Sequence, residues 1–167
     1  MGKRAAVPED FVINRYGEKE DKVAATAGAK SKKDFMTNLP ALGKLVDAVK
    51  LKSKQAGYLR SLDGGKLMCR KPHAALNTLL QSAGAIVMKK ALIILDDALQ
   101  ADGLVPPTDY EFVANIHDEL QIDVLPQHSD KVKTFAENSI RLAGEAFQFR
   151  CPLKGNADAG PNWAATH

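Results

Sequence analysis

The sequence lacks the features that mark several common protein classes. Its two cysteines, Cys69 and Cys151, form no CxxC pair and no cysteine–histidine spacing typical of zinc, so we expect free, reduced thiols. No stretch approaches the roughly 18 consecutive apolar residues of a membrane span, and the N-terminus has no apolar run typical of a signal peptide. No internal repeat is present. A chain of 167 residues with 45% apolar residues therefore predicts one soluble, intracellular domain.

Charge is distributed unevenly along the chain. Residues 1–72 contain 16 Lys and Arg against 8 Asp and Glu, whereas residues 73–167 contain 7 against 12. A basic segment beside an acidic one suits a protein that contacts a polyanion with one region and collects carboxylates in another. A solvated charged surface would give the same distribution, so the charge pattern leaves both interpretations open.

Apolar spacing and turn residues predict an α+β fold, in which long helices pack on a small antiparallel sheet. The expected elements are helices over residues 21–39 and 40–55, a hairpin around Asp63-Gly64-Gly65, a long helix over 72–102 followed by Gly103, a strand–turn–strand over 112–124, a helix over 130–147 and a looped tail over 149–167. Asn38 and Ser129 are the expected N-caps of the second and last helices. The predicted organisation is an irregular extension over 1–20, a helical segment over 21–56 and a main region over 57–167.

A polar row is expected on the long helix, where His73, Asn77 and Gln81 stand four residues apart and share one face. Amide side chains both donate and accept hydrogen bonds, which suits the mixed pattern of a nucleic-acid minor groove. The solvent-facing stripe of an amphipathic helix has the same spacing, so the row alone does not decide between the two.

The tripeptide His117-Asp118-Glu119 lies between two apolar strands. Adjacent carboxylates at the mouth of a hairpin concentrate negative charge at one point, and Mg²⁺ is held by one or two carboxylates together with substrate phosphates. A solvated turn accepts the same residue types, and local chemistry alone favours that interpretation.

Three further features have simple structural explanations. Asp63 is expected to serve its Asp-Gly-Gly turn through backbone hydrogen bonds and not to bind metal. Trp163 is expected to anchor the tail in the core. Basic side chains on or beside the first hairpin are secondary candidates for phosphate contacts, and a solvated strand edge explains them nearly as well. They are Arg60, Lys66, Arg70 and Lys71.

Three segments taken together resemble the C-terminal part of the family A DNA polymerases, nearest in pattern to the replicative enzymes of short-tailed phages. They are LDGGKLMCRKPHAALNTLLQSAGA, IHDELQIDV and GPNWAATH, and the resemblance covers about residues 28–167. Three motifs in the right order are far more specific than one. The resemblance implies that residues 57–167 form a partial polymerase palm, and that residues 21–56 follow the fingers region.

In that family the His-Asp-Glu turn is motif C of the palm. The resemblance therefore implies that Asp118 binds two catalytic Mg²⁺ ions, that Glu119 supports the metal site or the primer end, and that His117 lies against the primer's terminal nucleotides. Asn77 and Gln81 would contact the minor groove of newly formed base pairs. His73 takes a position that is often arginine in the family.

Motif A, with the second metal-binding aspartate, has no counterpart in these 167 residues, and neither has the fingers helix, of which Tyr16-Gly17 is a faint echo. We therefore expect a C-terminal fragment or small subunit of a split DNA-directed DNA polymerase. It would act on primer–template DNA and dNTP only when a larger chain supplies motif A, fingers and thumb. Because the sequence begins with Met1, we expect a separately encoded or deliberately cut piece. No membrane partner is expected, and the expected location is the cytoplasm of a phage-infected or prophage-bearing bacterium.

Two other functions stay open. One is a non-catalytic DNA-binding or interaction module derived from a polymerase palm. The other is a metal-dependent nuclease that uses Asp118 and Glu119, with Asp123 or Glu111 as further ligands.

Overall fold

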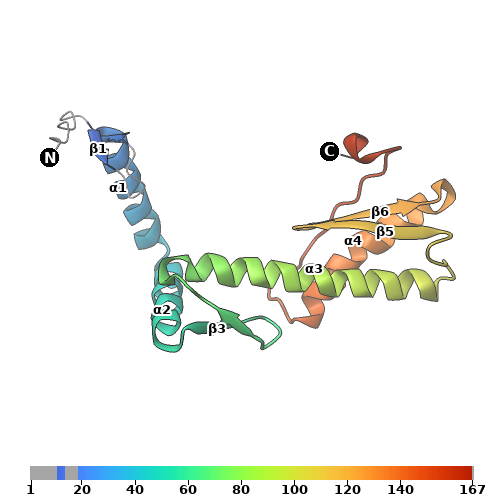
Figure 1. The fold of residues 1–167 in the computed structure, drawn as a ribbon, viewed down its shortest axis with the longest axis horizontal. Helices are drawn as coiled ribbons and strands as arrows, with labels where there is room; N and C mark the ends of the chain where they lie inside the picture. Colours follow the sequence, from blue (N-terminus) through green and yellow to red (C-terminus); the bar gives the residue numbers. More distant parts are fainter. Residues whose placement is uncertain (1–10, 14–18, 167) are drawn as a thin grey trace, which may run out of the picture. The chain divides into compact units, whose positions relative to one another are not determined.

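The computed structural model describes the backbone of residues 11–13 and 19–166 (Figure 1). Within these ranges the chain is α+β, as expected, with four α-helices and three two-stranded antiparallel sheets. The strands are β1 (Phe11–Ile13), β2 (Lys19–Asp21), β3 (Tyr58–Arg60), β4 (Lys66–Met68), β5 (Tyr110–Ile116) and β6 (Glu119–Val124). The helices are α1 (Lys22–Asn38), α2 (Pro40–Ala56), α3 (Ala75–Ala101) and α4 (Ser129–Ala146). Two compact units, residues 1–51 and 52–167, divide the chain within α2.

The first unit contains β1, β2, α1 and most of α2. We expected residues 1–20 to be irregular, but β1 pairs with β2 in the described part of that segment, and residues 1–10 and 14–18 lie outside the description. The aromatic and β-branched run of β1 favours an extended backbone. Asn38 is also not the cap of α2. It is the last residue of α1, and Leu39 lies between the helices, with its carbonyl accepting the amides of Leu42 and Gly43.

The second unit begins with the end of α2 and the β3–β4 hairpin, in register from Tyr58 opposite Met68 to Arg60 opposite Lys66. Pro72 then opens a single 3-10 turn before α3, since its fixed φ and missing N–H suit the first turn of a helix. The helix ends as the sequence predicts, with Gly103 at φ 90°, where the absent Cβ removes the usual steric cost.

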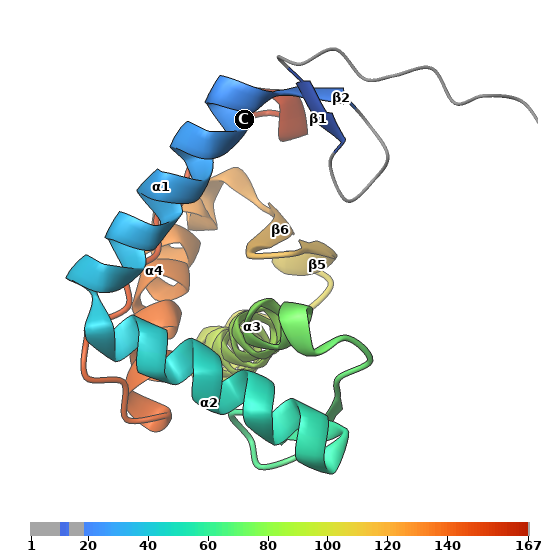
Figure 2. The same ribbon diagram turned by 90° about the vertical axis from the view of Figure 1, so that its left-hand side faces the viewer.

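The main core lies where α3, the β5–β6 hairpin and α4 meet (Figures 1 and 2). Leu95 and Leu99 of α3 are fully buried against Tyr110 and Val132. Burying one such leucine contributes about 1.5–3 kcal/mol to stability. The ring of Tyr110 meets that of Phe112 edge to face, with centroids 5.8 Å apart. This packing fixes the base of the hairpin on the two helices.

A β-bulge interrupts the β5–β6 ladder. Phe112 lies opposite Ile122, but the next partner on β5 is Ala114, opposite Gln121, so Val113 is an extra residue. Beyond the bulge the ladder continues to Ile116 opposite Glu119, which leaves two residues for the turn. The bulge thus shifts the strand pairing at the hairpin tip by one residue relative to the pairing at its base.

The last helix and the tail differ from expectation at two residues. Ser129 is the first residue of α4 and not its cap; a 3-10 turn places His128 at that position, with no side-chain capping bond. The tail is looped as expected, ending in a 3-10 turn over Trp163–Ala165. The prediction that Trp163 is a core anchor is wrong, because its side chain is 54% exposed. The tail is instead held on α4 through Leu153, which packs against the cluster around Ala143.

Among the described helices, the segment Pro72–Ala101 is long and apolar enough to cross a membrane by length and composition. The sequence has no uninterrupted apolar run of that length, because Lys89 and Lys90 break it. Of the most apolar 18-residue window of this helix, 22% is buried inside the structure. Here the helix packs Val87, Ala91 and Leu95 against α4 and the hairpin.

Candidate functional site

The tip of the β5–β6 hairpin is a two-residue turn formed by His117 and Asp118. Two-residue hairpin turns match the twist of the strands only when at least one central residue has positive φ. His117 takes this role with a φ of 57°, although left-handed backbone is uncommon for a residue with a Cβ. The turn is therefore tight, and Asp118 is held at its outer end.

The two carboxylates at this tip have different surroundings. The Asp118 side chain is exposed and makes no hydrogen bond or ion pair with the described residues, whereas Glu119 is half-buried and its Oε1 accepts a hydrogen bond from the Gln121 side chain. Both line one groove. An exposed carboxylate beside a hydrogen-bonded one suits a metal ion whose remaining ligands come from outside these residues.

The donor set fits half of a Mg²⁺ site. Over residues 11–13 and 19–166 no three His, Cys, Asp or Glu side chains cluster as metal ligands. Glu111 and Asp123, the extra ligands that a nuclease would need, lie opposite each other near the base of the hairpin. Ile116 is five residue steps along the strand from Glu111, a distance of about 17 Å. They do not join Asp118.

The polar row lies at the start of α3. His73, Asn77 and Gln81 are all exposed, but His73 belongs to the 3-10 turn that precedes the helix. Asn77 and Gln81, four residues apart in regular α-helix, share a face as expected. Ala75 is fully buried on the opposite side, so the row faces outward.

The β3–β4 hairpin has one basic, exposed face. Arg60 and Lys66 are paired across the strands, and both cations lie near the ring of Tyr58, at 6.0 and 5.1 Å from its centroid. The opposite face carries the buried Leu59. The two cations were candidates from the sequence, but Tyr58 was not. Side chains two residues apart on a strand share a face, so the sequence could have assigned Tyr58 to the face of Arg60. Arg70 and Lys71 are exposed between this hairpin and α3.

Asp63 serves its own turn, as the sequence predicts. Its carboxylate accepts hydrogen bonds from the Ser61 hydroxyl and, at 3.1 Å, from the Gly65 amide. These bonds stabilise the charged form, the Ser61 bond most, and lower the pKa of Asp63 below its ordinary value.

The groove that contains Asp118 and Glu119 has a volume of about 1280 Å³ and lies between the hairpin, α4 and the tail. The tail contributes residues from Lys154 to Thr166, including Trp163. Sequence reasoning placed Trp163 in the core because a single tryptophan near a terminus is more often buried. The groove therefore brings together the second and third of the three sequence motifs.

Comparisons with known proteins identify the family of the chain. Residues 15–165 match the family model of DNA polymerase family A. The DNA-directed DNA polymerases of Escherichia phage T7 and Enterobacteria phage T3 are 34% and 35% identical to this chain, and each alignment covers 91% of the chain and 25% of the relative. The chain thus spans about a quarter of the length of these curated relatives.

Solved structures are also similar in fold. The POL domain of Pol1 from M. smegmatis, in complex with DNA primer-template and dNTP, matches with a TM-score of 0.60 and 20% identity. The match covers 77% of this chain and 23% of that one.

Proposed function

Because the chain belongs to the family A DNA polymerases, we propose that it supplies the motif C half of a polymerase active site. It corresponds to part of a family A polymerase domain. The observation that carries the proposal is the tip of β5–β6, where Asp118 stands exposed on a tight turn next to Glu119, at the groove. The residues 57–167 would then form part of the palm, as the resemblance implies.

In this proposal Asp118 binds catalytic Mg²⁺ and Glu119, held by Gln121, supports the site from the strand. Bound Mg²⁺ would supply charge stabilisation as a primer 3′-hydroxyl attacks the α-phosphate of a dNTP and pyrophosphate leaves. The chain itself contributes by holding the Asp118 carboxylate in place. The two-residue turn fixes where the carboxylate stands, and a preorganised charge costs no rearrangement during the reaction. His117, beside it in the turn, would meet the primer end.

The DNA contacts in this proposal come from two other surfaces. Asn77 and Gln81 donate to and accept from base edges in the minor groove, and His73 extends the row toward the preceding turn. The cations of the β3–β4 face and of the following segment contact phosphates, since phosphate contacts position a duplex without reading its sequence. These cations are Arg60, Lys66, Arg70 and Lys71.

The rest of the proposed site comes from a larger polymerase chain that carries motif A, fingers and thumb. The motif A aspartate would supply the ligands that the described residues do not bring to Asp118. Primer–template DNA and dNTP are the proposed substrates.

The test uses the 167-residue chain mixed with the upstream segment of a related phage polymerase, a primed template and Mg²⁺. We expect association and primer extension. Asp118→Ala should abolish extension while the affinity for primer–template, measured by fluorescence anisotropy, changes less than about threefold, because exposed surface changes away from contacts have small effects. Asp123→Ala, on the base of the same hairpin, is the matched control and should keep extension. Failure of the unaltered mixture to associate or extend would overturn the proposal.

A further inference from the structure

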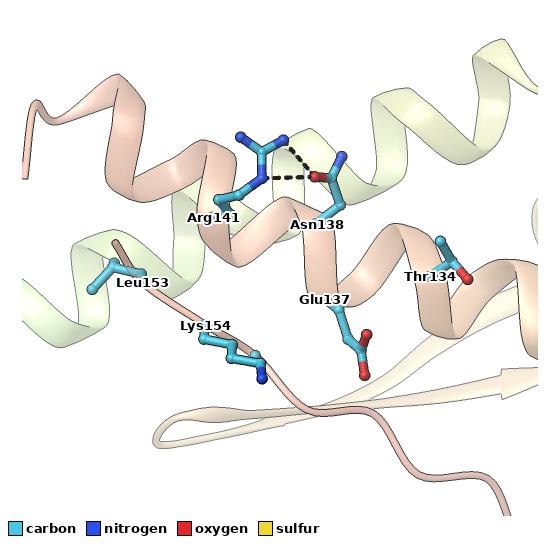
Figure 3. Close-up of a pocket in the computed structure, with 7 residues that line it drawn as sticks. Thr134, Glu137, Asn138, Arg141, Leu153 and Lys154 are labelled. Atoms are coloured by element: carbon cyan, nitrogen blue, oxygen red, sulfur yellow. Dashed lines mark hydrogen bonds between the residues drawn. The ribbon is translucent and has the colours of Figure 1, made fainter. Parts of the chain in front are cut away.

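The tail lies along one face of α4 in a fixed register (Figure 3). Leu153 stands over Gly144, where an added Cβ would lie 2.9 Å from its Cγ. Gly155 stands over Ile140, where an added Cβ would lie 2.9 Å from the Cγ1 of that residue. Two residues further on, the amide of Ala157 donates to Glu137 Oε1 at 3.1 Å. The tail therefore runs antiparallel to the helix through three successive contacts.

The spacing of these contacts follows from the two backbones. The helix residues are four and then three positions apart, which keeps them on one face, while the tail residues are two apart, which keeps them on one side of an extended chain. Four extended residues cover about 13 Å and seven helical residues about 10.5 Å, so the two rows stay nearly in step. A slip of one residue would turn the wrong side of the tail to the helix.

Both glycines are required by space and not by backbone conformation. Neither has a positive φ, yet at each position a Cβ would come closer to a neighbour than real contacts allow. Gly144 is also buried, with the Leu153 side chain over it, so an added methyl group would have no open space to enter. Such close approach of backbone to a neighbour is a recurrent use of glycine.

The docked segment leads to the final turn. Gly160 packs on Ala165, where an added Cβ would lie 2.7 Å from the Ala165 Cβ, and the Asn162 side chain accepts the Ala165 amide at 3.1 Å. The turn over Trp163–Ala165 is thereby folded back on the tail. Trp163 and Thr166 line the same groove as Asp118 and Glu119.

We propose that the docked segment 153–157 positions the terminal turn as one wall of the groove at the motif C carboxylates, which makes Gly144 and Gly155 positioning residues for nucleotidyl transfer. This inference rests on the proposed function. Neither glycine touches substrate; each acts by fixing the path of the tail, and so the position of Trp163. The wall limits how a primer end reaches Asp118.

The test compares Gly144→Ala and Gly155→Ala with Gly28→Ala, a helical glycine whose added Cβ would meet nothing within 4 Å. Trp163 is the only tryptophan in the sequence, so its fluorescence reports on the tail alone. We expect altered Trp163 emission and acrylamide quenching in the two tail variants and none in Gly28→Ala. Leu153→Ala removes the side chain that holds the tail on α4 and should alter the emission in the same direction as the two glycine variants.

Extension in the mixture with the upstream polymerase segment is measured on the same variants. We expect kcat/KM for primer extension to fall at least about tenfold in both tail variants, because misplacement by about 1 Å at a reacting site can cost roughly 100-fold. Leu153→Ala should lower extension in the same direction. Unchanged Trp163 fluorescence, or a displaced tail with unchanged extension, overturns the inference.

The two proposals fail separately. If the unaltered chain does not extend a primer, the proposed function is overturned and the tail loses its role in the reaction. The fluorescence of the tail variants still tests whether the glycines set its path. If extension occurs but ignores the glycines, only the positioning role is lost.

Discussion

The two hairpins of the second unit each carry an aspartate in their turn, but the two turns use it differently. In the five-residue turn of β3–β4, the Asp63 carboxylate accepts hydrogen bonds from the Ser61 hydroxyl and the Gly65 amide of the same turn. In β5–β6 the two-residue turn leaves Asp118 exposed, with no partner among the described residues. A turn aspartate with satisfied oxygens stabilises its loop. One with open oxygens is available to a ligand.

The hairpins also differ in how they are anchored. The β3–β4 hairpin buries Leu59 of its six strand residues, whereas β5–β6 inserts Tyr110 into the main core. The Tyr110 hydroxyl donates to Asp96 Oδ1 of α3 at 2.5 Å. The tip that carries the proposed metal ligand thus stands on a packed base, as a preorganised site requires.

The strongest test of this difference between the two hairpins is to neutralise each aspartate separately. Asp118→Asn should lower primer extension by the reconstituted polymerase by about 1000-fold, on the scale of losing a preorganised charge at a reacting centre. Asp63→Asn should stay within about twofold, since its role is local. Single-turnover extension rates measure both. Equal losses in the two variants would show that exposure in the turn does not separate the two roles.

The anchoring of β5–β6 can be tested by alkaline titration. Burial, followed by the hydrogen bond to the Asp96 carboxylate, raises the pKa of Tyr110 to about 12. The neutral hydroxyl is favoured in the fold, so its stabilisation is complete below pH 10 and is lost as pH rises from 10 to 12. The loss amounts to about 3 kcal/mol at most.

Denaturation of the unaltered chain and of Tyr110→Phe across this pH range measures the effect. The free energy of unfolding of the unaltered chain should fall relative to that of the variant. Tyr58→Phe, on the other hairpin, is the matched control. Parallel curves for the unaltered chain and Tyr110→Phe would contradict the assigned anchor.

The smallest expected effect concerns backbone strain in the two turns. Gly64 at φ 84° has the conformation that glycine accepts freely, whereas His117 at φ 57° does not. Gly64→Ala should lower the free energy of unfolding by about 1 kcal/mol, and His117→Gly should raise it by up to about 1 kcal/mol. Urea denaturation of both variants checks the signs. A destabilised His117→Gly would mean that the imidazole makes contacts that outweigh the strain.

The elements of the second unit were predictable because local signals and tertiary structure agree there. Pro72 and Gly103 bracket the long helix, and Asp63-Gly64-Gly65 marks the first hairpin, since these residues act through φ and missing groups that need no partner. Capping was predicted less well. Ser129 was displaced from the cap position by a 3-10 turn, a choice that depends on the preceding proline and its packing.

The site was predictable only in part. The sequence predicted the turn at His117-Asp118 between two strands, and the structure confirms its position. Local chemistry alone favoured a solvated turn, so the prediction of a metal site there depends on the resemblance. The predicted burial of Trp163 was wrong, because the tail is held on α4 by two glycine contacts and one hydrogen bond, whose spacing of two against four and three leaves no pattern in either segment alone. The roles of individual residues in catalysis and DNA binding stay predictions.

The bulge at Val113 adds to β5 one residue that has no partner on β6. An extra residue of this kind bends the strand and increases its local twist. Buried and exposed side chains still alternate through β5, and β6, which carries Glu119, has no extra residue. The bulge therefore leaves the two faces of the hairpin unchanged and alters the direction in which its far end leaves the core. A single backbone unit, with no reactive group of its own, thus helps to aim the acidic tip.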